Sequence, residues 1–142
     1  MIVCAESSAV LRWIFGTPQA AEVAKILSKA EEVFSSRLTL VEVERVLVRQ
    51  IVVGALREAD AAEARRLWAA AVAQWRVVEI TQAICERAGL RFAREPLRTL
   101  DAIHLATALF VNQLAADVWL LSTDARLCEN AEMLGLRCLS VG

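Results

Sequence analysis

The chain has 142 residues, a formal net charge of −1, and a composition that is 57% hydrophobic and 23% charged. This composition excludes a disordered chain, and the charge balance argues against a bulk basic field for nucleic acid. We expect one densely packed domain over residues 1–142. The apolar runs are too short to cross a bilayer and the first residues lack a basic segment, so we expect a cytoplasmic protein without a signal peptide.

Short apolar runs typical of buried strands alternate with longer helical patterns. In chain order, we predict a strand over 1–5, helices over 7–14 and 18–31, a strand over 32–36, helices over 39–53 and 57–75, a strand over 76–80, helices over 81–94 and 99–114, a strand over 117–122, a helix over 124–135 and a strand over 136–141. This alternation predicts a parallel sheet with helices on both faces, a three-layer α/β/α sandwich.

The cysteines and the histidine restrict the possible metal chemistry. Cys4, Cys85, Cys128 and Cys138 are scattered, without a CxxC pair, and we expect them to be reduced thiols. His104 is the only histidine, which excludes a zinc site rich in histidine.

Four acids fall near one edge of the predicted sheet. In a parallel sheet, the carboxyl ends of the strands and the amino ends of the following helices share an edge, where ligand sites form. Glu6 and Asp124 directly follow predicted strands, and Asp101 and Glu42 lie in the first turns of predicted helices. Carboxylates within about 4–6 Å of each other repel, and a hard divalent cation such as Mg²⁺ or Mn²⁺ relieves this repulsion. Each acid alone has the alternative role of helix cap or solvated surface group.

Several neighbours of these acids have competing interpretations. Thr99 and Thr123 are expected to be N-caps of the helices that follow them. His104 lies one turn after Asp101 and is either a base or, as we favour, a hydrogen-bonded core histidine. Glu44 cannot face the same way as Glu42, so we expect it at the surface beside an arginine.

Four segments together resemble a known family. They are "AESSAVLRW" (5–13), "SSRLTLVEVERVLVR" (35–49), "LDAIHLATAL" (100–109) and "LLSTDARLCENAEMLGL" (120–136). Their order and spacing are similar to those of PIN domains, specifically the VapC-like ribonuclease toxins. The resemblance spans nearly the whole chain.

The resemblance implies a fold, an activity and partners. It implies the strand order 3-2-1-4-5 and an endoribonuclease that uses Mg²⁺ or Mn²⁺ to cut single-stranded RNA, leaving 5′-phosphate and 3′-hydroxyl ends. It implies a homodimer, held inactive by a small antitoxin protein. The catalytic, metal-holding acids would be Glu6, Glu42, Asp101 and Asp124, with the hydroxyls of Ser8 and Ser122 in support.

This chain departs from the family pattern at the first acid, where the family usually has aspartate and this chain has Glu6. The extra methylene moves the carboxylate, and Mg²⁺ tolerates displaced ligands poorly. The alternative function is therefore a catalytically weakened PIN domain that serves as an RNA- or antitoxin-binding module. A phosphoacceptor receiver domain is disfavoured, because it needs an Asp at the end of the third strand and a Lys after the fifth, where this chain has neither.

Arginines and a tryptophan near the acidic edge are candidate contacts for RNA. Arg12, Arg45, Arg49 and Arg98 either hold phosphates or are solvated or paired with acids. Trp13 would stack a base or line an antitoxin groove, whereas Trp68, Trp75 and Trp119 are expected in core or dimer contacts. The helices over 18–31 and 39–53 either form a groove for a partner helix or pack on each other.

Overall fold

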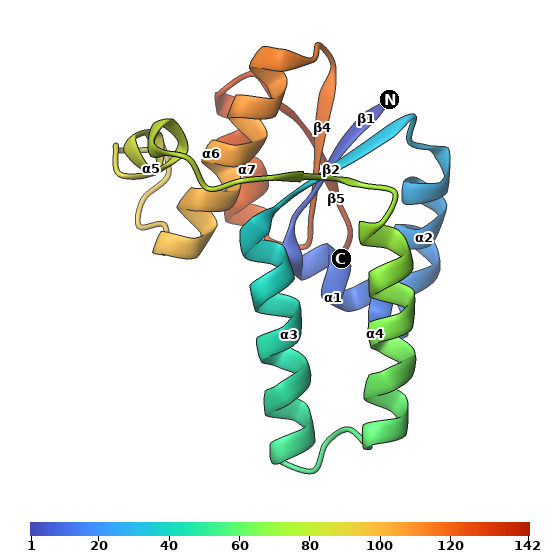
Figure 1. The fold of residues 1–142 in the computed structure, drawn as a ribbon. Coiled ribbons are helices and arrows are strands. Elements are labelled where there is room, and N and C mark those ends of the chain that lie inside the picture. The colour runs from blue at the N-terminus through green and yellow to red at the C-terminus, as the bar shows by residue number, and fades with distance from the viewer.

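The structure, a computed structural model, describes all of residues 1–142 (Figure 1). Its elements in chain order are β1 (Ile2–Ala5), α1 (Ser7–Ile14), α2 (Ala20–Lys29), β2 (Glu32–Ser36), α3 (Arg37–Val52), α4 (Glu58–Val72), β3 (Arg76–Val78), α5 (Gln82–Ala88), α6 (Thr99–Leu114), β4 (Val118–Ser122), α7 (Ala125–Met133) and β5 (Arg137–Ser140).

The five strands form one parallel sheet in the order β3-β2-β1-β4-β5. This confirms the predicted fold class and strand order. β1 lies at the centre, with Ala5 paired opposite Leu121 of β4. The chain builds outward from β1 to β3 on one side and then from β4 to β5 on the other. The direction of strand addition therefore reverses between β1 and β4, which is where α/β sheets usually place a ligand site.

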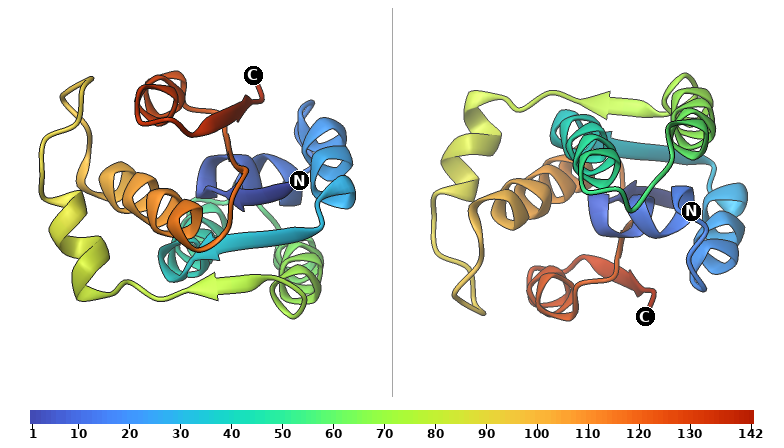
Figure 2. Two further views of the ribbon diagram at one scale, coloured as in Figure 1. Left: turned by 90° about the horizontal axis from the view of Figure 1, so that it is seen from above. Right: turned by 90° about the horizontal axis from the view of Figure 1, so that it is seen from below.

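Each face of the sheet carries its own hydrophobic cluster, because alternate strand residues point to opposite faces. Val3 and Ala5 of β1 pack with residues of α1 to α4, including Leu47 and Trp68. Cys4 of the same strand packs with residues of α6 and α7 on the opposite face. The two views of Figure 2 show these helix layers on the two sides of the sheet, and Figure 1 shows α3 and α4 projecting together beyond its edge.

Most predicted boundaries agree with the structure to within two residues, but two helices end earlier than predicted, α4 at Val72 instead of residue 75 and α5 at Ala88. α3 begins at Arg37 rather than near Thr39, because Ser36 is its N-cap and accepts a hydrogen bond from the Leu38 amide at 3.1 Å. α6 begins at Thr99 itself, so the prediction that Thr99 is the N-cap was wrong; Arg98 occupies that position without a side-chain bond. α5 ends at Ala88, six residues earlier than predicted.

The segment after α5 is a loop, residues 89–98, held by side chains instead of by helical hydrogen bonds. The Glu95 carboxylate accepts hydrogen bonds from the amides of Phe92 and Leu97, which hold its pKa below the usual value. The buried Asn130 of α7 donates to the Arg94 carbonyl and accepts from the Arg94 amide. These bonds satisfy the loop backbone, so the helical pattern does not need to continue to Pro96.

Two of the four cysteines are not free thiols. Cys128 of α7 and Cys138 of β5 form a disulfide, so the expectation of four reduced thiols was wrong for this pair. Cys4 is free and buried, as expected, and burial raises its pKa to about 12, with a smaller contribution from the charge of Glu6. None of the helices is long and apolar enough to span a bilayer.

Replacing Asn130 with alanine is expected to destabilise the chain. The change leaves the Arg94 amide and carbonyl without their partner, at a cost of about 2–4 kcal/mol in the free energy of unfolding. Urea unfolding measures the loss, and amide exchange in residues 89–98 should rise. Asn112→Ala on α6 is the matched control, and equal stability of the two variants would contradict this account of the loop.

Candidate active site

The candidate site lies where β1 and β4 end side by side. The Glu6 amide continues the sheet by donating to the Leu121 carbonyl at 3.0 Å, so Glu6 is level with the end of β4. Asp124 follows two residues after β4. This placement follows from the predicted strand order and brings two acids from distant parts of the sequence to the same edge.

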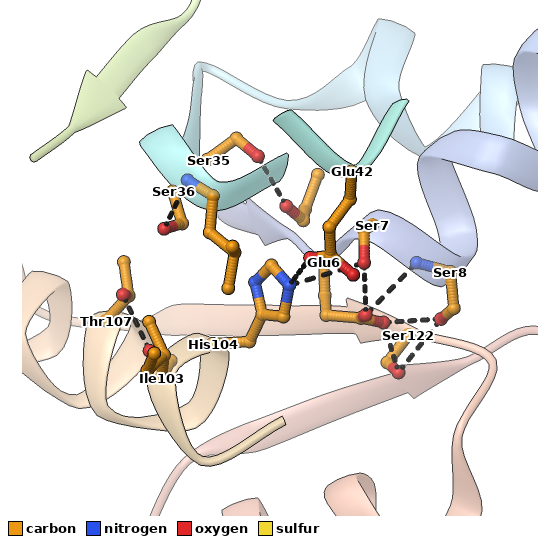
Figure 3. Close-up of polar contacts among 12 residues, drawn as sticks. Glu6, Ser7, Ser8, Ser35, Ser36, Glu42, Ile103, His104, Thr107 and Ser122 are labelled. Atoms are coloured by element: carbon orange, nitrogen blue, oxygen red, sulfur yellow. Dashed lines mark hydrogen bonds and ion pairs between the residues drawn. The ribbon is translucent and has the colours of Figure 1, made fainter. Parts of the chain in front are cut away.

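The Glu6 carboxylate is buried, with 4% of the residue exposed, and it is surrounded by donors (Figure 3). Oε1 accepts hydrogen bonds from Ser7 Oγ at 2.9 Å and from the Ser8 amide at 3.1 Å. Oε2 accepts from Ser122 Oγ at 2.9 Å and from Ser8 Oγ. Four donors match the roughly four lone-pair sites of a carboxylate, which explains how a charge can be buried here.

The two serines predicted to support the site both contact Glu6 and also reach the turn that carries Asp124. Ser8 Oγ accepts from the Thr123 amide, and Ser122 Oγ accepts from the Asp124 amide, each at 3.0 Å. The prediction that Thr123 caps α7 was wrong, because Asp124 is the N-cap and its Oδ1 accepts from the Leu127 amide at 3.0 Å. Ser8 does not cap α1 either, since Glu6 occupies that position.

Asp101 completes a group of three acids whose charges interact. Its pKa is raised mainly by burial, and further by the charges of Asp124 and Glu6. Arg98 opposes this shift weakly, because its Nε lies 4.0 Å from Asp101 Oδ2 and its side chain is 91% exposed. The charges of Asp124 and Glu6 therefore disfavour ionisation of the Asp101 carboxyl.

Glu42 joins the site through His104. The Glu42 Oε1 atom makes a short hydrogen bond with His104 Nε2, which also lies 3.3 Å from Ser7 Oγ. His104 is 3% exposed, which confirms the favoured interpretation of a hydrogen-bonded core histidine. Glu44 points away and pairs with Arg65 at 3.0 Å, also as predicted.

Ser7 is a residue of the site that was not predicted from the sequence. This residue is buried and its hydroxyl lies between Glu6 and His104 (Figure 3). Its position directly after an acid at the start of a helix was the available signal, because such a hydroxyl can turn back toward the preceding side chain.

The four acids suit a hard divalent cation by their chemistry, but their side chains are not arranged as a complete set of metal ligands. All four acids offer oxygen atoms, which Mg²⁺ and Mn²⁺ prefer, and the pKa of Asp101 is raised mainly by burial and further by the negative charges of Asp124 and Glu6. However, no three Asp, Glu, His or Cys side chains form a ready-made metal cluster. Glu6 and Glu42 are held by hydroxyl and imidazole groups, whereas Asp124 uses one oxygen to cap α7 and Asp101 has only Arg98 nearby, at 4.0 Å.

The exposed arginines, which include those predicted to bind phosphate, differ in whether an acid pairs with them. Several exposed arginines are paired with acids, for example Arg37 with Glu79 and Arg76 with Glu32. Arg12 of α1 and Arg45 and Arg49 of α3 form no ion pair and are exposed. Arg45 and Arg49 follow Glu42 at intervals of three and four residues, so they extend along α3 from the site.

A groove between α1 and α3 adjoins these arginines. It has a volume of about 630 Å³, and its lining combines Leu11, Phe15, Val46 and Leu56 with Arg12 and Arg49. Trp13 does not line it. Trp13 stacks on Trp75 with ring centroids 6.0 Å apart, and Trp75 contacts Trp68 edge-on.

Comparisons with known proteins agree with this architecture. The family model described as PIN domain matches residues 3–133. Ribonuclease VapC45 of Mycobacterium tuberculosis is 37% identical over 105 residues, which is 72% of this chain and 70% of the relative. FitAcB from Neisseria gonorrhoeae superimposes with a TM-score of 0.72 at 15% identity, covering 99% of this chain and 97% of that one. VapBC-1 from nontypeable Haemophilus influenzae gives 0.68 at 14% identity, covering 99% and 98%. These structures share the fold.

Replacing Asp101 with asparagine is expected to stabilise the metal-free protein at neutral pH. Because the folded state raises the pKa of Asp101, the folded form holds this proton more tightly than the unfolded chain does. Stability is therefore lost as pH rises through the unfolded and then the folded pKa. Asp101→Asn should gain a few tenths to about 1 kcal/mol at pH 7, after allowance for partial solvent screening, and the gain should vanish near pH 3.

Chemical unfolding at the two pH values measures this difference. Asp60→Asn is a matched control, because Asp60 also lies in the first turn of a helix, three residues after an arginine. Its substitution should give no such gain. Equal effects of the two changes at pH 7 would show that burial and the neighbouring acids do not disfavour ionisation of Asp101.

Proposed function

Because the chain belongs to the PIN domain family, we propose that it is a metal-dependent endoribonuclease that cuts single-stranded RNA. The observation that carries this proposal is the meeting of acids from four separate elements at one sheet edge. Asp101 and Asp124 would hold Mg²⁺ or Mn²⁺ directly. The charges of the buried Glu6 and the half-buried Glu42 would add to its attraction. When bound, such a cation activates water and stabilises negative charge on a scissile phosphate.

The residues around the acids have distinct tasks in this proposal. Ser8 and Ser122 hold the Glu6 carboxylate and the turn before α7 together, which fixes Asp124 relative to Glu6. Arg12 and Arg45 carry unpaired charges that would bind RNA phosphates, and the exposed Arg98 would do so beside Asp101. RNA would thus be attracted by local basic groups even though the whole chain has a net charge of −1.

The alternative function is that of an RNA- or antitoxin-binding module with weakened catalysis. The specific observation that favours it is that both oxygens of Glu6 are already engaged by four donors. The two functions predict different behaviour for the same purified protein, because a nuclease cuts the RNA that it binds and a binding module does not.

The proposed regulatory partner is a small antitoxin whose apolar helix lies in the groove between α1 and α3. Relatives with this fold have been solved as complexes described as toxin–antitoxin or VapBC assemblies. The groove offers apolar walls with Arg12 and Arg49 on its lining, which suits a helix that carries a carboxylate. A partner placed there would cover Arg12 and lie next to the acids.

A second copy of the chain is the other proposed partner. Val41, Val48 and Val52 are exposed on α3, spaced so that they share one side of the helix. Val52 is 78% exposed, which is unusual for a large aliphatic residue and suits a homodimer contact.

Cleavage of a single-stranded RNA in Mg²⁺ or Mn²⁺ tests the enzyme function. Asp101→Asn and Asp124→Asn should each lower the rate at least about 100-fold, since each removes a charge that attracts the cation. Asparagine preserves the N-cap at position 124, so the fold should persist. Asp60→Asn should cleave like the unmodified chain.

Unchanged cleavage by folded Asp101→Asn and Asp124→Asn proteins would refute the proposed mechanism. A protein that binds RNA and Mn²⁺ without cutting, but gains activity through Glu6→Asp, would instead support the binding-module function.

Co-purification with any small protein encoded immediately upstream tests the antitoxin proposal. Val46→Glu should abolish the complex, because it places a charge in the apolar groove near the expected carboxylate. Val52→Glu, on the same helix but outside the groove, should keep the complex while disturbing any homodimer in light-scattering measurements. Loss of the complex with Val52→Glu but not with Val46→Glu would show that the groove is not the docking site.

A further inference from the structure

His104 lies at the meeting point of three elements that carry acids. It comes from α6, three residues after Asp101, and its ring reaches Glu42 of α3 and Ser7 at the start of α1 (Figure 3). We propose that His104 is a positioning residue that fixes the Glu42 carboxylate and, through Ser7, the Glu6 carboxylate at the cation site. This inference rests on the proposed nuclease function.

The hydrogen-bonding capacity of each group determines where the imidazole proton lies. A carboxylate can only accept, so Glu42 requires a proton on His104 Nε2. Ser7 has one hydroxyl proton, and it is donated to Glu6 Oε1 at 2.9 Å. Ser7 Oγ therefore meets His104 Nε2 as an acceptor, at 3.3 Å. Both contacts require the same tautomer, with the proton on Nε2.

The Nε2–H group of His104 thus links Glu42 to Glu6 through Ser7, although the two acids lie on separate elements. Glu42 lies on α3, and Glu6 lies between β1 and α1. The Glu42 side chain is 24% exposed, so without His104 it is free to turn toward solvent. α6 then has two functions at the site, since it contributes Asp101 and also holds Glu42 and Glu6 through His104.

The same helix offers a comparison for a purely structural role. Thr107 is buried like His104, but its hydroxyl donates to the Ile103 carbonyl within α6 and contacts no acid. Thr107→Val and His104→Leu each remove a buried hydrogen bond. Only the change at His104 releases Glu42, so a difference between the variants in cation binding isolates the positioning role.

Nuclear magnetic resonance of the ring nitrogens tests the geometry without any activity measurement. His104 is the only histidine, so its ring signals need no further assignment. We expect the neutral ring to carry its proton on Nε2 and Glu42→Gln to shift the Nε2 signal. A ring protonated on Nδ1, or signals insensitive to Glu42→Gln, would overturn the proposal.

Binding of Mn²⁺ alone and steady-state RNA cleavage test the consequence. His104→Leu should weaken Mn²⁺ binding by about 10-fold or more and lower kcat while leaving KM for RNA within about twofold, as loss of a group that orients metal ligands does. His104→Gln keeps an N–H donor and should recover most of both losses. Thr107→Val should bind Mn²⁺ like the unmodified chain.

The outcomes separate this inference from the proposed function. Failure of the unmodified chain to bind Mn²⁺ or cut RNA would contradict the nuclease function itself. Normal Mn²⁺ binding and kcat in His104→Leu would contradict only the positioning role. If His104→Leu does not fold, the positioning role is tested by the tautomer of His104 and by Mn²⁺ binding to His104→Gln and Thr107→Val. A His104→Gln protein that folds but binds Mn²⁺ about 10-fold more weakly than Thr107→Val overturns the proposal.

Discussion

The burial of the Glu6 carboxylate between the ends of β1 and β4 is the constraint on which the rest of the site depends. A charge in this position would oppose folding unless donors surrounded it. Three serine hydroxyls and one amide supply those donors, and they come from both sides of the point where strand addition reverses. The hydrogen bonds that make the charge tolerable therefore also join α1 to the turn before α7.

The four acids differ in how many of their carboxylate oxygens are engaged by hydrogen bonds. Glu6 is fully hydrogen-bonded, and Glu42 is held by His104. Asp124 uses one oxygen to cap α7, and Asp101 has only a distant arginine beside it. The repulsion that remains is expressed at Asp101, where burial and the charges of Asp124 and Glu6 raise the pKa. The unfavourable charge is thus felt at Asp101, whose oxygens are the least engaged of the four, and this is the arrangement that the proposed cation site requires.

The sequence predicted the fold well because its signals are local and strong. The apolar runs at Ile2–Ala5 and Val118–Ser122 and their alternation with helices are enough to specify a covered parallel sheet. The convergence of Glu6, Glu42, Asp101 and Asp124 followed from the direction of the strands. The contacts inside the site could not be predicted in the same way, because the roles of Ser7 and His104 depend on side-chain rotations of residues up to 97 positions apart. The end of α5 was missed for a related reason, since Asn130 satisfies the loop backbone from a distant helix.

The glutamate at position 6 can be understood from the lengths of the side chains involved. N-cap residues are usually short, because the side chain must turn back to an amide two or three residues later. Glu6 reaches the Ser8 amide with Oε1 and, because its chain is one methylene longer than that of aspartate, its other oxygen extends to Ser122 across the sheet edge. The longer acid is thereby matched to a set of hydroxyls at positions 7, 8 and 122. In the proposed nuclease, Glu6 would contribute its charge, which acts on Asp101, and the serines that hold its carboxylate would be as necessary to the site as the acid itself.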